Sequence, residues 1–174
     1  GYFIFTNMAP GTYTVTETVP PGWTTSGSPQ TVTVNSGTVS TAVVTNTRDT
    51  GSLAITKQVQ GQCETGTIFP VSITGPGGYH SSYIFSCSGG THTFTNPPTG
   101  DYTITEAVPE GWTASGLPQT VTVSKGTTAT ATVTNIRDTG SLAINKQVTG
   151  QCLPGTTFPV TISGPGNYIA THAF

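Results

Sequence analysis

Charged residues are scarce in this chain of 174 residues: they make up 7% of the sequence, against about 25% in ordinary soluble domains. The formal net charge of −2 excludes the basic surface that binding to nucleic acid requires. No apolar run approaches the roughly 20 residues of a membrane span. No signal peptide or sorting signal is visible either, so we expect a fragment or a processed product.

Helical periodicity is also missing, because no segment carries apolar residues at helical spacing over three turns. Threonine, valine, glycine and proline dominate instead, a balance that favours strands and turns over helices. Alternating runs such as 119–123 are frequent, and turn residues separate them. The sequence therefore predicts an all-β fold, a Greek-key β-sandwich, with strands at 52–59, 68–74, 82–87, 91–95, 101–108, 118–123 and 128–136.

An internal repeat sets the organisation of the chain. Trp23 recurs at position 112 and Gly51 at position 140, so the sequence repeats at an interval of 89 residues. We expect residues 51–139 to form one complete repeat, residues 1–50 the C-terminal part of a preceding repeat, and residues 140–174 the N-terminal part of the next. The partial repeats complement each other, either within a continuing chain, which we favour, or between separate chains. Both arrangements give a filament.

The positions of the three cysteines follow the same 89-residue repeat. Cys63 and Cys152 are equivalent, whereas the counterparts of Cys87 fall just outside both ends of the sequence. We predict a Cys63–Cys87 disulfide, with the partner of Cys152 outside the chain, and hence an oxidising, extracellular compartment. The alternative is a pair of buried reduced cysteines. We expect no metal site, because no CxxC or paired-histidine spacing accompanies these residues, and no cofactor.

Three polar residues interrupt the apolar faces of predicted strands. With the two-residue period of a strand, Lys57 shares a face with Leu53 and Ile55, Glu106 lies on the apolar face of 101–108, and Asn135 on that of 128–136. Burying an isolated charge costs on the order of several kcal/mol, so such groups are normally paired or neutralised. All three are retained where both copies can be compared.

These residues lie in segments that identify a family resemblance. Residues 51–57, 102–112 and 133–135 resemble the corresponding segments of Cna B-type domains, the SpaA-like, prealbumin-fold modules of bacterial pilins and surface adhesins. The resemblance covers the complete repeat and both partial ones. It implies that Lys57 and Asn135 form an intramolecular isopeptide bond promoted by Glu106. Burial would favour the neutral amine that attacks the amide.

The same resemblance assigns Glu17 and Asn46 to a lysine of a preceding repeat, and Lys146 to a following repeat. If separate chains complement each other, Lys146 would instead join Asn46 of its neighbour. The alternative to the bond is an unreacted, buried Lys57–Glu106 ion pair with Asn135 hydrogen-bonded beside it. The cysteine pair departs from the pattern of Gram-positive pilins, and no sortase signal or pilin-motif lysine is present.

Rival functions have weaker support. The Asp-Thr-Gly-Ser segments at Asp49 and Asp138 are similar to the catalytic loop of aspartic proteases, which needs two apposed carboxylates, but each follows an arginine at a repeat junction. We therefore predict no enzymatic activity. Trp23 and Trp112 are interpreted as core residues rather than carbohydrate platforms. The outward threonine rows could carry O-glycans; no N-glycosylation sequon is present.

The sequence thus predicts a structural subunit of a bacterial extracellular or cell-surface filament, whose partners are copies of itself or adjoining repeats placed end to end. The stalk of a cell-surface adhesin is the alternative.

Overall fold

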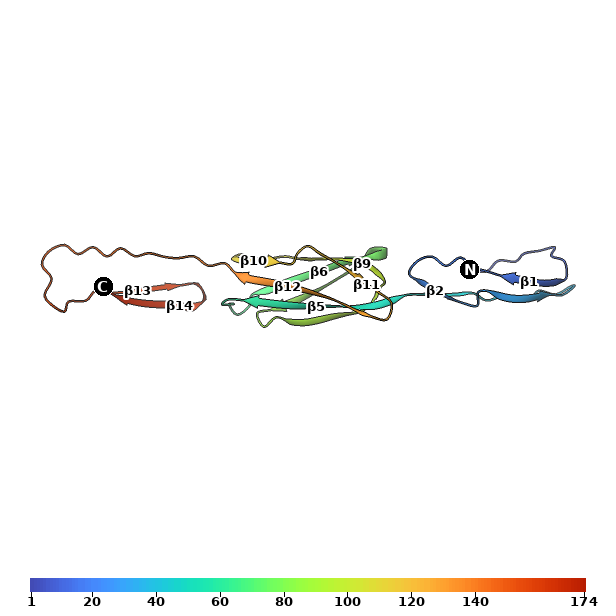
Figure 1. Cartoon of the computed structure of the whole chain (residues 1–174), viewed down its shortest axis with the longest axis horizontal. Coiled ribbons are helices and arrows are strands. Elements are labelled where there is room, and N and C mark those ends of the chain that lie inside the picture. Colours follow the sequence, from blue (N-terminus) through green and yellow to red (C-terminus); the bar gives the residue numbers. More distant parts are fainter.

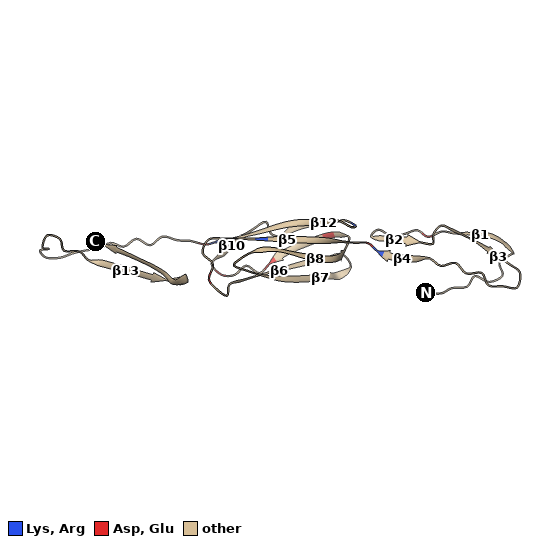
Figure 2. Cartoon of the chain, turned by 90° about the horizontal axis from the view of Figure 1, so that it is seen from below, with Lys and Arg blue, Asp and Glu red and all other residues tan.

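The computed structural model describes residues 1–174 as an elongated molecule with a complete β-sandwich in the middle (Figure 1). We call residues 50–137 the central sandwich, residues 1–49 the N-terminal portion and residues 138–174 the C-terminal portion. The two portions lie at opposite ends of the long axis in both views (Figures 1 and 2). The few charged residues are scattered along the ribbon (Figure 2).

Two four-stranded sheets form the central sandwich. The first has the strand order β10-β12-β5-β8 and the second β11-β9-β6-β7. A short 3₁₀ turn, η1, joins β6 to β7. The bounds are β5 Thr50–Gln60, β6 Ile68–Gly75, η1 Pro76–Gly78, β7 Tyr79–Ser86, β8 Gly90–Pro98, β9 Gly100–Glu106, β10 Trp112–Ser115, β11 Gln119–Val123 and β12 Thr128–Arg137.

The hydrophobic core lies between these sheets. Alternation places Leu53 and Ile55 of β5 inside while their neighbours Ser52 and Ala54 are partly exposed, as the pleat of a strand requires. These findings confirm the all-β sandwich prediction. The thirteen buried hydrophobic residues are Leu53, Ile55, Phe69, Val71, Ile73, Phe85, Phe94, Tyr102, Ile104, Trp112, Val123, Ala131 and Val133.

Strand β5 is the centre of the first sheet. It pairs in parallel with β12 from Ser52 to Gln60 and antiparallel with β8 on its other side. Because β5 begins the central sandwich and β12 ends it, their parallel course makes the chain enter at one end of the sandwich and leave at the other. Successive portions of the chain therefore follow one another along a line (Figure 1).

The sequence-based strands differ from the structure in several places. Strand β8 continues to Pro98 rather than ending at residue 95, and β9 ends at Glu106 rather than at residue 108. Strand β10, Trp112–Ser115, was not predicted, because its four residues show too short an alternation to be recognised. It forms because it pairs with residues 134–137 of β12. Strand β7 begins at Tyr79 rather than at residue 82, since it pairs with β6 immediately after the η1 turn.

The terminal portions contain only short two-stranded sheets. In the N-terminal portion β1 pairs with β3 and β2 with β4; in the C-terminal portion β13 pairs with β14 across the turn η2. No helix in the structure has the length and apolar character needed to cross a membrane. The bounds are β1 Gly11–Val15, β2 Trp23–Ser26, β3 Gln30–Val34, β4 Thr45–Arg48, β13 Pro159–Gly164, η2 Pro165–Asn167 and β14 Tyr168–Ala173.

Candidate cross-link site

A buried lysine is the centre of the candidate site. Lys57 continues the inward face of β5 beyond Leu53 and Ile55, and its side chain has no exposed area. Its Nζ lies 4.7 Å from the ring centroid of Phe69 on the facing strand β6, a contact in which the aromatic face attracts a cation. Phe69 was not singled out from the sequence, because one more phenylalanine in an apolar strand carries no distinguishing signal.

Glu106 and Asn135 both contact this amine. Lys57 Nζ donates hydrogen bonds to Oε1 of Glu106 and to Oδ1 of Asn135. Lys57 and Asn135 come from neighbouring strands of the first sheet, whereas Glu106 ends β9 in the second, so the cluster joins the two sheets. The side chains of all three are buried. The structure thus brings together the three residues that the sequence predicted as a group.

Burial changes the acidity of the lysine. The pKa of the Lys57 amine is lowered from its usual range, because removal from water disfavours the ammonium form; hydrogen bonding and charge attraction from Glu106 act in the opposite direction. A lowered lysine pKa increases the fraction of neutral amine, which is the nucleophilic form.

Two polar atoms of the cluster have no hydrogen-bond partner. They are Oε2 of Glu106 and Nδ2 of Asn135, and both are buried. Buried polar groups are almost always hydrogen-bonded, so an orphaned pair in one cluster points to strain or chemistry rather than to stability alone. The unpartnered Nδ2 is the atom that leaves if an amine replaces it on the Asn135 carbonyl.

The N-terminal portion holds an incomplete version of this cluster. Asn46 Nδ2 donates to Oε1 of Glu17 at 2.6 Å, and the Thr25 hydroxyl donates to Oε2 of Glu17 at 2.8 Å. No lysine accompanies them. Lys146 lies in the C-terminal portion, with its Nζ 4.8 Å from the ring centroid of Phe158, the equivalent of Phe69. Within one chain, the structure does not bring Lys146 to Glu17 and Asn46.

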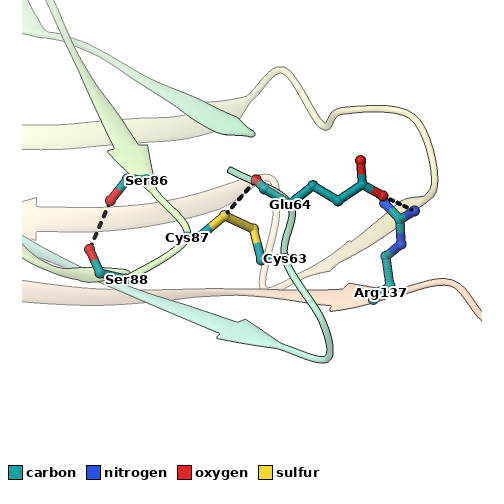
Figure 3. Close-up of a disulfide and its surroundings, with 6 residues drawn as sticks. All are labelled: Cys63, Glu64, Ser86, Cys87, Ser88 and Arg137. Carbon is teal, nitrogen blue, oxygen red and sulfur yellow. Dashed lines mark hydrogen bonds and ion pairs between the residues drawn. A yellow bond between two sulfur atoms is a disulfide. The ribbon is translucent and has the colours of Figure 1, made fainter. Parts of the chain in front are cut away.

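A disulfide closes the loop region at one end of the central sandwich (Figure 3). Cys63 and Cys87 are bonded, with their Cα atoms 5.7 Å apart, a usual separation for a disulfide. The Cys87 Sγ also lies 3.2 Å from the carbonyl oxygen of Glu64. Cys152, by contrast, is a free and exposed thiol. The disulfide ties the segment after β5 to the turn between β7 and β8.

The prediction that both tryptophans are core residues holds for Trp112 but not for Trp23, which is 37% exposed in this chain and has the Arg48 guanidinium 5.3 Å from its ring centroid. Trp112 is buried, and its ring packs edge-on against that of Phe69, with the ring centroids 5.1 Å apart.

The Asp-Thr-Gly segments have structural positions. Asp49 pairs with Lys125 at 2.8 Å where the central sandwich begins, whereas Asp138 accepts a hydrogen bond from Thr113 just after β12 ends. The two carboxylates are therefore at opposite ends of the sandwich and are not apposed within the chain.

Comparison with known proteins gives no family assignment from sequence, since no family model and no curated protein matches the chain. A search of solved structures finds similar chains at low identity. The chain is similar to the major pilin T-13 of Streptococcus pyogenes, with 21% identity and a TM-score of 0.44, over 77% of this chain and 69% of that chain.

It is also similar to a mutant form of a major pilin of Streptococcus pyogenes, with 16% identity and a TM-score of 0.43, over 79% of this chain and 75% of that chain. For the Bacillus anthracis TIE protein the identity is 17% and the TM-score 0.44, over 75% of this chain and 35% of that chain.

Proposed function

We propose that the chain belongs to a structural subunit of an extracellular, pilus-like filament on a bacterial cell surface, built from tandem β-sandwich repeats of which residues 51–139 are one. The observation that carries this proposal is the buried cluster in which Lys57 of the first strand and Asn135 of the last strand of the central sandwich meet Glu106 of the facing sheet. The role is mechanical: each repeat fastens itself, and successive repeats are joined end to end.

The fastening reaction is the formation of an isopeptide bond inside the cluster. Proton transfer from Lys57 to Glu106 leaves a neutral amine, whose Nζ attacks the Cγ of Asn135. The new bond is Nζ–Cγ and the bond that breaks is Cγ–Nδ2. The proton held by Glu106 passes to Nδ2 and ammonia leaves, while the second proton of Nζ passes to the Glu106 carboxylate, so the amide forms with Glu106 protonated. The close contacts of Nζ with both partners, the exclusion of water and the lowered lysine pKa support this route.

The bond would carry load past most of the repeat. A pull applied at Thr50 reaches Lys57 along β5, crosses to Asn135 and leaves through the end of β12. The 78-residue separation between the two residues is then bypassed, so the sheets between them do not have to resist the force.

Intact-mass measurement of the reduced chain tests the proposal. We expect a mass about 17 Da below the encoded value, the loss of one ammonia, and a branched peptide joining Lys57 to Asn135 after proteolysis. Asn135→Ala and Glu106→Ala should each restore the mass encoded by the variant. An unaltered mass in the unsubstituted chain would leave an ion pair in place of the bond and remove the fastening mechanism.

An adhesin stalk is the second candidate, and the same load-bearing cluster would serve it. Electron microscopy of native material separates the two functions. Regular filaments with a beaded repeat indicate a fibre, whereas isolated rods tethered to cells, each ending in a larger head, indicate a stalk. O-glycosylation of the outward threonines is proposed for either case and is checked by glycan staining before and after β-elimination.

A further inference from the structure

The two terminal portions expose residues whose equivalents are buried in the central sandwich. Phe5 is 75% exposed, whereas Phe94, one repeat interval later, is 5% exposed. Leu142 is 70% exposed, whereas its equivalent Leu53 is fully buried. The same contrast holds for Val44, Ile144 and Phe174, the equivalents of Val133, Ile55 and Phe85. Each portion thus has an inner face with nothing packed on it.

The missing partners of one portion are present in the other. Displaced by one repeat interval, the N-terminal portion contains the equivalents of β8, β9, β10, β11 and β12, and the C-terminal portion those of β5, β6 and β7. In the central sandwich β5 lies between β12 and β8. The N-terminal portion therefore lacks the central strand of its first sheet, and residues 139–149 have the sequence of that strand.

Secondary structure is lost where these partners are absent. Strand β12 spans ten residues, but its equivalent β4 spans only four, and residues 39–44 before it are irregular. Residues 1–9, equivalent to β8, and residues 139–149, equivalent to β5, form no strand either. In the central sandwich, the equivalents of these three irregular segments are neighbours in one sheet, where β5 pairs with β12 on one side and with β8 on the other.

We propose that residues 140–174 of one copy of this chain assemble with residues 1–50 of a second copy into a sandwich of the same design as the central one. The two portions of one chain cannot meet, because the central sandwich separates them along the long axis (Figures 1 and 2). The contact is consequently head-to-tail between copies, and a head-to-tail contact that does not close on itself builds an open filament.

The register of the new sandwich follows from the existing one. Val133 pairs with Lys57, so Val44 pairs with Lys146 across the joint; Thr74 pairs with Thr103, so Ser163 pairs with Thr14. This placement brings Lys146 beside the hydrogen-bonded side chains of Glu17 and Asn46.

A covalent joint, which rests on the proposed function, then becomes available. Glu17 accepts a proton from the Lys146 ammonium, and the neutral Nζ bonds to the Cγ of Asn46. Glu17 gives that proton to Nδ2, the Cγ–Nδ2 bond breaks and ammonia leaves, while the second Nζ proton passes to Glu17. Cys152 takes no part in the joint, because the portions contain no equivalent of Cys87. In a longer array, the same segments would find equivalent partners within one chain, so the experiment uses the 174-residue chain.

Two blocked variants test the assembly, both in a Cys152→Ser background that prevents disulfide dimers. Ile144→Asp places a charge on the inner face of the C-terminal portion and leaves the N-terminal portion usable; Val44→Asp does the opposite. We expect the parent chain to form a concentration-dependent series of multiples of the 17.9 kDa chain in sedimentation velocity and light scattering. Each variant alone should be monomeric, and their mixture should stop at dimers.

Matched controls distinguish the proposed strand pairing from nonspecific hydrophobic association. Val39→Asp changes an exposed valine whose equivalent, Thr128, is also exposed in the central sandwich, so assembly should continue. Thr14→Cys combined with Ser163→Cys should form an intermolecular disulfide, because partners in an antiparallel pair are close enough for one. Thr31→Cys combined with Ser163→Cys should not, since Thr31 lies one strand beyond Thr14.

The outcomes distinguish this proposal from the isopeptide bond. A parent chain that stays monomeric overturns the assembly, even if its mass shows the Lys57–Asn135 bond. Growth of the mixture beyond dimers, or assembly of either blocked variant alone, overturns it as well. Assembly under native conditions that dissociates completely in detergent supports the pairing and removes the covalent joint. With the covalent joint, a detergent-resistant ladder appears, and Lys146→Arg abolishes the ladder while native assembly persists.

Discussion

Lys57 and Asn135 lie on adjacent parallel strands but are not paired with each other: Lys57 is opposite Val133, and Asn135 is opposite Val59. The two-residue stagger keeps both side chains on the inner face of the sheet, where the lysine side chain can reach along the groove between strands to the amide. Because β5 starts the sandwich and β12 ends it, a bond between these residues connects the entrance and the exit of the repeat.

Force spectroscopy on the central sandwich is expected to depend on Asn135. The unsubstituted sandwich should resist extension, because the force bypasses the residues between Lys57 and Asn135. Asn135→Ala should allow the sandwich to unfold and lengthen. With the Cys63–Cys87 disulfide intact, this lengthening should be shorter by about 8 nm than under reduction, the extended length of the 24-residue separation that the disulfide spans. Extension of the unsubstituted sandwich by the full length would contradict the load path.

Removal of the disulfide should lower stability without changing the load path. Replacing Cys63 and Cys87 together by serine is expected to reduce the free energy of unfolding by about 3 kcal/mol, because the unfolded chain regains the freedom of a loop with 24-residue separation. Denaturant titration measures the change. Cys152→Ser serves as the control and should have little effect, since that thiol is free and exposed. Equal losses in the two variants would assign no stabilising role to the disulfide.

Gly75 is predicted to be intolerant of a side chain. A Cβ at this position would lie 2.3 Å from Cε1 of Tyr102, whose ring is fully buried and whose hydroxyl donates a hydrogen bond to the Pro98 carbonyl at 2.8 Å. Because the ring is packed and its hydroxyl is anchored, Gly75→Ala should destabilise the central sandwich by about 1–3 kcal/mol.

Thermal unfolding provides the measurement for Gly75→Ala. Gly164→Ala, at the equivalent position of the C-terminal portion, is the control, because nothing lies within 4 Å of a Cβ there within the chain. It should leave the unfolding of the central sandwich unchanged. The same melting temperature for Gly75→Ala and the parent chain would mean that the Tyr102 ring can move aside.

The junction before the central sandwich should respond to pH and salt. Asp49 accepts from Lys125 and from Thr24 of the N-terminal portion, and these contacts hold the pKa of Asp49 below its usual value of 3.8. A carboxyl whose folded pKa is lowered stabilises the contact above its unfolded pKa, and the contact is lost as the pH falls through the lowered value. High salt should weaken it at neutral pH.

The orientation of the N-terminal portion relative to the central sandwich, followed by residual dipolar couplings, measures this effect. Lys125→Ala should broaden the range of orientations at neutral pH and remove most of the salt dependence. Lys125→Arg, which retains the charge, should largely preserve the orientation. Identical couplings in Lys125→Ala and the parent chain would show that the single residue between β4 and β5 fixes the junction unaided.

Two regularities of the sequence, the alternation of strands and the 89-residue repeat, were enough to predict much of this protein's organisation. The alternation of β5 and β12 placed Lys57 and Asn135 on inner faces, because the period of a strand depends only on the backbone. The repeat interval related Cys63 to Cys152 and indicated where Cys87 had its counterparts. Neither kind of inference needs to know which strands are neighbours.

Tertiary structure alone decided the contacts between elements that are distant in sequence. It placed β5 between β12 and β8, put Glu106 across the core from the first sheet, and brought Phe69 against the Lys57 amine. It also formed β10, whose four residues become a strand only by pairing with β12. It placed Lys125 against Asp49, a contact that the repeat does not indicate because Lys125 does not recur in the other copy. The physical reason is common to all of these. Strand periodicity fixes which face a side chain occupies, but only the packing of two sheets fixes what that face meets.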